Sequence, residues 1–346
     1  MQSSGGTILI TGSSGVLGTA VAAELSSGYD VLCLRHRTAV DRPGVREIAA
    51  DLTAPGLGLS AVDRDLVSST DVIVHCAATT SFHNDRTKMS AVNIVGTQRI
   101  LDLAAATGAR LVHLSTAFVA RHQPELEDEP LLVRGPAAYV ESKVAAETLV
   151  RSSGLPSMTV RPSVVIGDSR TGEIRKAQGL HALCGAMMRS EVPLLGIRPT
   201  SLVDCIPQER VAMAIRRLID RGVPTGEIWL TAGDQALTAR EVIDLALAVG
   251  VDADLRPARF RMVDPEMVNR LLLPMVADPA LKRLRRRFEE MSALMELFAQ
   301  TEPFPSTWEV ADPQLRPDHD ELVDALDLSL RWWAEREGLF ETEGVA

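Results

Sequence analysis

A glycine-rich turn between a short apolar run and a helical stretch is the feature that most constrains this fold. The run TILIT (residues 7–11) leads into TGSSGVLG (residues 11–18, sharing Thr11), in which three glycines are spaced GxxGxxG. In a strand–turn–helix context this spacing indicates a dinucleotide-binding turn, although an ordinary strand–helix turn is the alternative. The first glycine permits a sharp turn, the second a close pyrophosphate and the third tight helix packing. We predict that the turn binds pyrophosphate at the helix N-terminus through Gly12, Ser14, Gly15, Val16, Leu17 and Gly18.

Apolar runs that predict strands alternate with helical stretches through the first half of the chain. We predict strands at 7–11, 30–35, 45–52, 71–77, 110–119 and 158–166, and helices at 16–25, 93–106 and 139–150. Strands alternating with helices imply parallel β–α–β units joined by right-handed crossovers. The fold class expected is α/β, a doubly wound parallel sheet of the Rossmann kind, with a smaller, mostly helical C-terminal substrate region.

The pattern loosens after Gly167. Helices are predicted at 178–190, 207–221 and 238–249, a strand at 227–231, and mostly helix from about Arg256. We therefore expect a cofactor domain at 1–170, with sheet elements returning at about 203–235, and a substrate-binding region at 171–346. An amphipathic stripe from Leu281 to Phe298 accompanies a basic run, Lys282 to Arg287. We interpret that run as a solvated face, with steering of phosphate-bearing substrates as the alternative.

Composition narrows the classes of function. The net charge of −10 over 346 residues argues against broad nucleic-acid binding, which needs a basic face. No apolar run reaches the ~18 residues of a membrane span, and the N-terminus lacks the pattern of a signal peptide. The four cysteines form no CxxC pair and have no metal-ligand spacing, so no metal site is predicted. A reducing, cytoplasmic location is the expectation.

The end of the second strand indicates which nicotinamide cofactor binds. An acidic residue there would bind the ribose hydroxyls of NAD, but the sequence reads Arg35-His36-Arg37. Two guanidinium groups suit a 2′-phosphate. We therefore predict NADP, with Arg35 preferred to Arg37 as its phosphate ligand and a solvated strand end as the alternative. Asp51 is expected to accept a hydrogen bond from the adenine amino group, with Leu52 beside the ring.

Tyr139 and Lys143 form a YxxxK pair on a predicted helix, and their i, i+4 spacing places both side chains on one face. An ammonium close to a phenol favours the phenolate, so we expect Lys143 to lower the pKa of Tyr139. Such a tyrosine could act as a general acid for a carbonyl. The lysine could also hold the nicotinamide ribose.

Hydroxyl and amide side chains complete the candidate site. Ser115 and Thr116 end the predicted strand 110–119, and strand carboxyl ends are where open α/β sheets bind ligands. Either hydroxyl could donate to a substrate carbonyl, or simply cap a turn. Asn93 opens a predicted helix, where it is a cofactor contact or an N-cap.

Several segments together resemble the extended short-chain dehydrogenase/reductases over about residues 7–235. They are the glycine turn, Asp51-Leu52, HCAATTSF (75–82), NIVGT (93–97), LSTAF (114–118), YVESK (139–143) and RPSVVIG (161–167). Within that superfamily the sequences of these segments are similar to those of fatty-acyl-CoA reductases and of the reductase domains that release carrier-bound thioesters. VDCIPQERVAMAI (203–215) resembles a further segment of this branch.

The resemblance implies roles for further residues. Cys76, Ala77 and Ala78 would line the cofactor, and Pro162 and Val165 would contact the nicotinamide. Alignment on Ala117 makes Thr116, rather than Ser115, the catalytic hydroxyl. The chain departs from the branch at Val16, where a phenylalanine is usual, and at 207–209, where an acid-bearing segment is replaced. From about residue 256 it matches no family segment, which leaves the substrate open.

The activity expected is NADPH-dependent hydride transfer to a carbonyl of a small-molecule or carrier- or CoA-bound acyl substrate. An acyl thioester or an aldehyde or ketone would serve. The alternatives are an NAD(P)-dependent epimerase or dehydratase, and a non-catalytic NADP-binding scaffold. Epimerases commonly carry an acid after the second strand, and scaffolds often lose the tyrosine or lysine. The sequence does not decide between a monomer and a homodimer.

Overall fold

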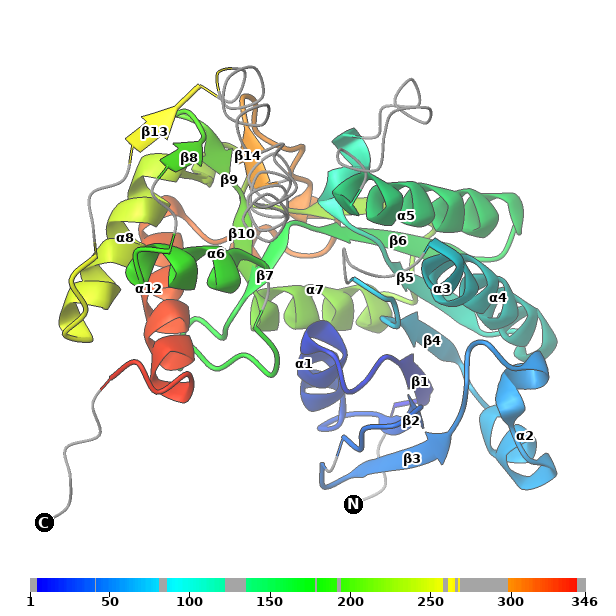
Figure 1. Cartoon of the computed structure of the whole chain (residues 1–346). Coiled ribbons are helices and arrows are strands. Elements are labelled where there is room, and N and C mark those ends of the chain that lie inside the picture. Colours follow the sequence, from blue (N-terminus) through cyan, green and yellow to red (C-terminus); the bar gives the residue numbers. More distant parts are fainter. Residues whose placement is uncertain are drawn as a thin grey trace, which may run out of the picture.

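The structure is a computed structural model that describes residues 5–40, 42–80, 86–121, 135–177, 179–191, 194–257, 261–264, 267 and 298–340. Figure 1 shows a large sheet with helices on both faces and a second group of helices at one side. The strands are β1 Thr7–Thr11, β2 Asp30–Arg35, β3 Val45–Ala49, β4 Val72–His75, β5 Arg110–Leu114, β6 Ser157–Pro162, β7 Val164–Ile166, β8 Leu194–Gly196, β9 Leu202–Val203, β10 Cys205–Pro207, β11 Gly226–Leu230, β12 Leu237–Thr238, β13 Arg261–Val263 and β14 Ala299–Gln300. The α-helices are α1 Val16–Leu25, α2 Ala61–Val67, α3 Arg86–Ser90, α4 Gly96–Thr107, α5 Gly135–Ser152, α6 Gly179–Met188, α7 Gln208–Asp220, α8 Ala239–Asp252 and α12 His319–Arg336.

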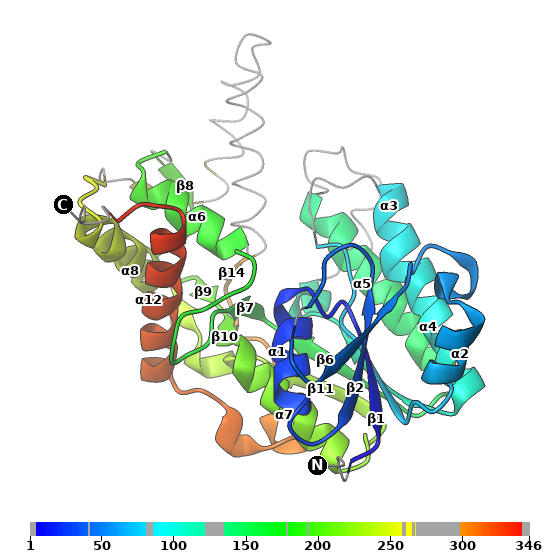
Figure 2. The same cartoon turned by 90° about the horizontal axis from the view of Figure 1, so that it is seen from below.

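Seven parallel strands form the main sheet in the order β11-β6-β5-β4-β1-β2-β3. Helices α1 and α7 pack on one face, and α2, α4 and α5 cover the other (Figures 1 and 2). The strand order reverses between β1 and β4, and such a switch point is where open α/β sheets bind their ligands. The predicted Rossmann fold is confirmed.

The second group of helices consists of α6, α8 and α12 (Figure 1). Short strands accompany them, among them an antiparallel set in the order β12-β9-β14 and a parallel pair of β8 with β13. These strands are only two or three residues long, which is too short for an alternating sequence pattern to predict them. None of the helices that the structure describes is both long and apolar enough to cross a membrane.

Several predicted elements differ in their bounds from the observed ones, and three of these differences affect the candidate site. The strand predicted at 110–119 ends at Leu114, and a 3-10 helix follows at Ala117–Arg121. The strand predicted at 158–166 is divided at Ser163, so that β6 stays in the main sheet while β7 pairs with β10. The helix predicted from Asn93 begins earlier, because α3 and a π-helical turn, Ala91–Val95, precede α4 without a break. Asn93 is therefore inside a helix, and the N-cap interpretation is wrong.

Candidate cofactor and active site

The glycine turn after β1 forms a cradle that side chains would fill. Gly12 has a φ of +66°, and a Cβ built on it would lie 2.6 Å from backbone atoms of Ala77. A Cβ on Gly18 would lie 2.1 Å from the carbonyl oxygen of Gly12. Gly15 is the N-cap of α1 and supplies no side-chain cap, so backbone N–H groups at this helix end face the turn. These features fit a pyrophosphate bound at a helix N-terminus.

The end of β4 lies beside this cradle. The backbone N–H of Cys76 donates to the carbonyl of Thr11 (3.2 Å), and the N–H of Ala77 donates to the Thr11 hydroxyl (3.2 Å). Cys76, Ala77 and the following Ala78 are thereby held against the glycine turn at the switch point, where the resemblance placed a cofactor.

Asn93 braces the segment that follows β4. Its carboxamide oxygen accepts from the N–H of Thr79 (2.8 Å), and its Nδ2 donates to the Thr79 carbonyl (3.1 Å) and to the Ser142 hydroxyl (2.9 Å). Both Nδ2 hydrogens are used inside the protein. Asn93 thus connects the loop carrying Ala78 to α5 beside Lys143, which is a bracing role that its predicted place at a helix start did not suggest.

The end of β2 is basic, but its arginines differ in their surroundings. The Arg35 guanidinium pairs with Glu47 of β3 (Nε to Oε2, 3.2 Å), whereas Arg37 is exposed. Asp51 accepts hydrogen bonds from the backbone N–H and the hydroxyl of Thr53 (both 2.7 Å), and these bonds lower the pKa of its carboxyl. Leu52 follows directly, and a Cβ on Gly96 of α4 would contact its side chain.

Sequence reasoning missed a third arginine at this end of the site. Arg175 lies in the loop after β7 and donates to the carbonyl of Ala39 (3.0 Å), two residues beyond Arg37. The neighbouring Ile174 is buried and the Glu173 carbonyl accepts from Gln208, so the loop is anchored here. No signal in the sequence connects residues 136 positions apart in this way.

The candidate catalytic groups meet where β5 ends. Thr116 forms a side-chain hydrogen bond with Tyr139 of α5 and accepts from the N–H of Phe118 (3.3 Å). One helical turn along α5, the Lys143 ammonium donates to the carbonyl of Leu114 (2.6 Å). Pro162 ends β6, the strand next to β5, and the half-buried Val165 lies in β7.

Burial controls the ionisation of this pair. It raises the pKa of Tyr139 to about 12, against a smaller lowering effect of the Thr116 hydrogen bond. The prediction that Lys143 lowers the pKa of Tyr139 is therefore not met in the protein alone, because desolvation of the phenolate outweighs other effects. A protonated phenol at neutral pH is nevertheless the form that can donate a proton. Burial also lowers the pKa of Lys143 to about 8.

Ser115 differs from its neighbour. Its hydroxyl oxygen is buried and has no hydrogen-bond partner among the residues that the structure describes. Thr116, in contrast, is the hydroxyl that contacts the phenol. This difference favours the preference for Thr116 that the resemblance suggested.

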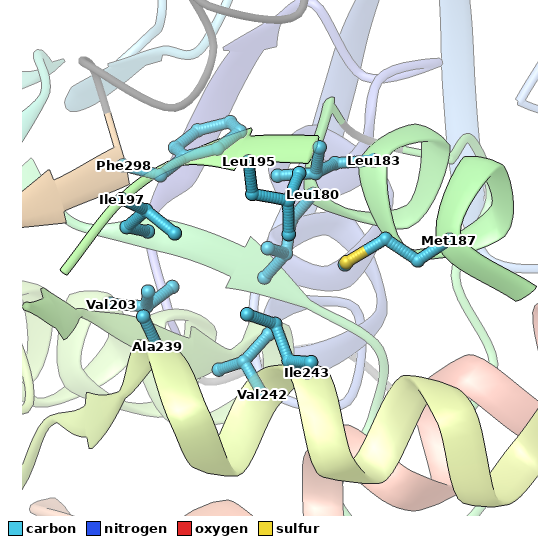
Figure 3. Close-up of a pocket in the computed structure, with 10 residues that line it drawn as sticks. All are labelled: Leu180, Leu183, Met187, Leu195, Ile197, Val203, Ala239, Val242, Ile243 and Phe298. Carbon is cyan, nitrogen blue, oxygen red and sulfur yellow. The ribbon is translucent and has the colours of Figure 1, made fainter. Parts of the chain in front are cut away.

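An apolar cavity lies among α6, α8, β8 and β9 (Figure 3). Phe298 lines it and also contacts Phe118, with ring centroids 6.1 Å apart, and Phe118 is two residues after Thr116. Every lining side chain is apolar: Leu180, Leu183, Met187, Leu195, Ile197, Val203, Ala239, Val242, Ile243 and Phe298. The remainder of the predicted stripe and the whole basic run from Lys282 to Arg287 lie outside the described residues.

Comparison with known proteins identifies the family. The profile described as "Male sterility protein", an NAD-binding family, matches residues 34–215, which is more than half of the chain. The chain belongs to this family. It is thus an NAD(P)-binding member of the extended short-chain dehydrogenase/reductase type, as the motifs indicated.

Related chains carry the family signal further. The equisetin synthetase of Fusarium heterosporum is 30% identical over 270 residues, which are 72% of this chain and 7% of that protein. A fatty acyl-CoA reductase of Drosophila melanogaster is 28% identical over 175 residues, 41% of this chain and 34% of that protein. The chain therefore spans only a small part of the length of these curated relatives.

Solved structures give the same picture. The terminal R domain of the myxalamid PKS-NRPS pathway is 25% identical, with a TM-score of 0.70 over 99% of this chain and 94% of that one. A UDP-N-acetylglucosamine 4-epimerase of Methanobrevibacter ruminantium has a TM-score of 0.66 at 15% identity, over 96% and 99% of the two chains. The second likeness shows the fold alone.

Proposed function

We propose that this family member is an NADPH-dependent reductase of acyl thioesters carried by a carrier protein or coenzyme A. The observation that carries the proposal is the meeting of Thr116, Tyr139 and Lys143 at the end of β5, next to the glycine cradle. Similarity to an R domain and to a fatty acyl-CoA reductase supports a thioester as the substrate. We also propose that residues 1–170, together with the sheet elements at about 203–235, form the cofactor domain. Residues 171–346 otherwise form the substrate-binding region.

The chain's own groups have distinct tasks in this reaction. Bound NADPH supplies the hydride. The Thr116 and Tyr139 hydroxyls donate hydrogen bonds to the carbonyl oxygen as negative charge develops on it, and Tyr139 then gives up its proton to that oxygen. The Lys143 ammonium stabilises the phenolate that Tyr139 leaves behind. The resulting hemithioacetal releases a thiol and an aldehyde.

A substrate panel tests the proposal. We expect NADPH absorbance to fall with acyl thioesters, and aldehyde and free thiol to appear in equal amounts. Free aldehydes and simple ketones are the comparison substrates. Faster turnover of a ketone than of any thioester would contradict the thioester assignment, and NADPH binding without turnover of any substrate would favour a scaffold.

The preference for NADPH gives a separate prediction. Replacing both arginines, Arg35→Ala with Arg37→Ala, should lower the ratio of NADPH to NADH affinity tenfold or more. The reason is that hydrogen bonds between charged groups contribute about 1.5–3 kcal/mol. Because Arg35 is shared with Glu47, Arg37→Ala alone should have the larger effect of the two single changes. Cofactor affinities measured by fluorescence titration check this.

Arg46→Ala is the matched control. Arg46 also lies in the β2–β3 pair, but it binds Asp30 at the start of β2, whereas Arg35 is at the end of that strand. An unchanged ratio in the Arg35/Arg37 double variant, with tight NADPH binding, would mean that the 2′-phosphate lies elsewhere.

We further propose that the acyl chain extends past Phe118 and Phe298 toward the apolar cavity. Ala239→Leu would fill that cavity, whose volume is about 20 Å³, and should lower kcat/KM for long-chain thioesters about fourfold, because an excluded methylene forfeits ~0.8 kcal/mol of burial. Short-chain thioesters should be unaffected. The exposed Ala248 of α8 provides the control Ala248→Leu. A uniform loss at all chain lengths would contradict this path for the chain.

A further inference from the structure

A row of buried polar groups runs along one face of α5. Tyr139, Lys143 and Glu147 are spaced four residues apart, so their side chains lie above one another on this helix. Lys143 and Glu147 are only 4% and 6% exposed. Glu147 takes no part in the proposed chemistry, yet a carboxylate buried this deeply is costly unless it has partners.

The partners of Glu147 continue the row to the surface. Arg161 of β6 binds it with two hydrogen bonds, Nε to Oε1 at 3.0 Å and Nη2 to Oε2 at 2.7 Å. The same guanidinium lies 2.7 Å from a carboxylate oxygen of Glu227 on β11 and 4.5 Å above the ring of Trp229. The side chain of Glu227 is 52% exposed. Charges of alternating sign thus run from the candidate active site to the edge of the sheet.

The other titratable groups around Lys143 are neutral. His75 at the end of β4, Cys76 directly after it and His113 of β5 lie around Lys143. Burial lowers the pKa of His75 to about 3 and that of His113 well below its usual value, and it raises the pKa of Cys76 to about 12. The acidic side chain on the same face of α5 is Glu147, one helical turn from Lys143 and bound by the Arg161 guanidinium.

We propose that Glu147 is a positioning residue that keeps Lys143 protonated, and that Glu227 tunes this effect from the surface through Arg161. The buried Lys143 ammonium donates to the carbonyl of Leu114 and is destabilised by desolvation, and the Glu147 carboxylate one helical turn away offsets this effect. Glu227 shares the Arg161 charge. Without Glu227, Arg161 would neutralise Glu147 more completely.

Lysine NMR can test the proposal without any substrate or cofactor. The chain has four lysines, Lys88, Lys143, Lys176 and Lys282, so the spectrum of protein labelled at lysine Cε is simple. The signal lost in Lys143→Arg identifies Lys143. We expect Glu147→Gln to lower the measured pKa of Lys143 by about one unit or more, the usual size of an opposite-charge effect at close range. Glu227→Gln should lower it less.

Two variants separate electrostatics from structure. Glu141→Gln removes another α5 carboxylate, one that pairs with Arg86 away from Lys143, and should leave the Lys143 pKa unchanged. Glu147→Asp keeps the negative charge, so the Lys143 pKa in this variant should be close to that of the wild type. If Glu147→Gln does not fold, the half-exposed Glu227→Gln still decides the matter. A Lys143 pKa that stays the same in every folded variant of Glu147 and Glu227 would overturn the proposal.

The catalytic consequence rests on the proposed function and has its own readout. In Glu147→Gln, Lys143 should lose its proton at lower pH. The alkaline limb of the pH profile of kcat/KM for thioester reduction should then move to lower pH by the same amount as the Lys143 pKa measured by NMR. A purely structural role would lower activity at all pH values without moving the limb. The NMR shift without any turnover would contradict the reductase assignment and leave the role of Glu147 intact.

Discussion

Replacing the proposed proton donor, Tyr139→Phe, should lower the rate of the proposed thioester reduction by ~10²–10⁴-fold, the usual contribution of general acid catalysis. The change removes the hydroxyl that bonds Thr116 but keeps the buried ring. NADPH affinity should therefore remain within a few-fold of the wild type. Steady-state kinetics with a thioester, together with a cofactor titration, check both expectations.

Tyr29 is the natural control, because the chain has two tyrosines. Its hydroxyl donates to Asp220 of α7 (2.5 Å), on the face of the sheet opposite to α5. Tyr29→Phe should therefore leave kcat unchanged. Activity of Tyr139→Phe within a few-fold of wild type would show that another group supplies the proton.

The Rossmann part of the fold followed from local sequence patterns. Strands β1 and β2 and helix α1 have the predicted bounds, because an apolar run that is buried on both faces of a parallel sheet is visible residue by residue. The strand pairs of the second group did not follow. Strands of two or three residues owe their pairing to neighbours distant in the sequence, and no periodicity develops over that length.

The candidate site shows the same division. Residues next to a recognisable turn or motif, such as Gly12 and Lys143, became candidates from their spacing in the sequence. Arg175 and Arg161 were not, because their contacts cross 136 and 14 residues and depend on which elements the fold brings together. Glu147 was within reach of sequence reasoning, since it extends the YxxxK spacing by one further turn of the same helix face.

The two adjacent hydroxyls at the end of β5 give the sharpest contrast between neighbouring residues. Thr116→Ala should lower kcat by ~10²–10³-fold, which is the usual cost of one lost donor to a developing oxyanion. Ser115→Ala should leave kcat nearly unchanged and keep or slightly raise the stability, because its buried oxygen has no partner among the described residues and its removal ends an unfavourable desolvation.

Kinetics and thermal unfolding of the two alanine variants, with Thr116→Ser as the conservative control, decide between the hydroxyls. Thr116→Ser keeps a hydroxyl in hydrogen-bond range of Tyr139 and should recover most of the activity. The reverse pattern, a large loss in Ser115→Ala and little in Thr116→Ala, would move the catalytic hydroxyl to Ser115. Tyr139 would then have to be oriented without the hydrogen bond that Thr116 now makes, and the side chains at the end of β5 would have to rearrange when substrate binds.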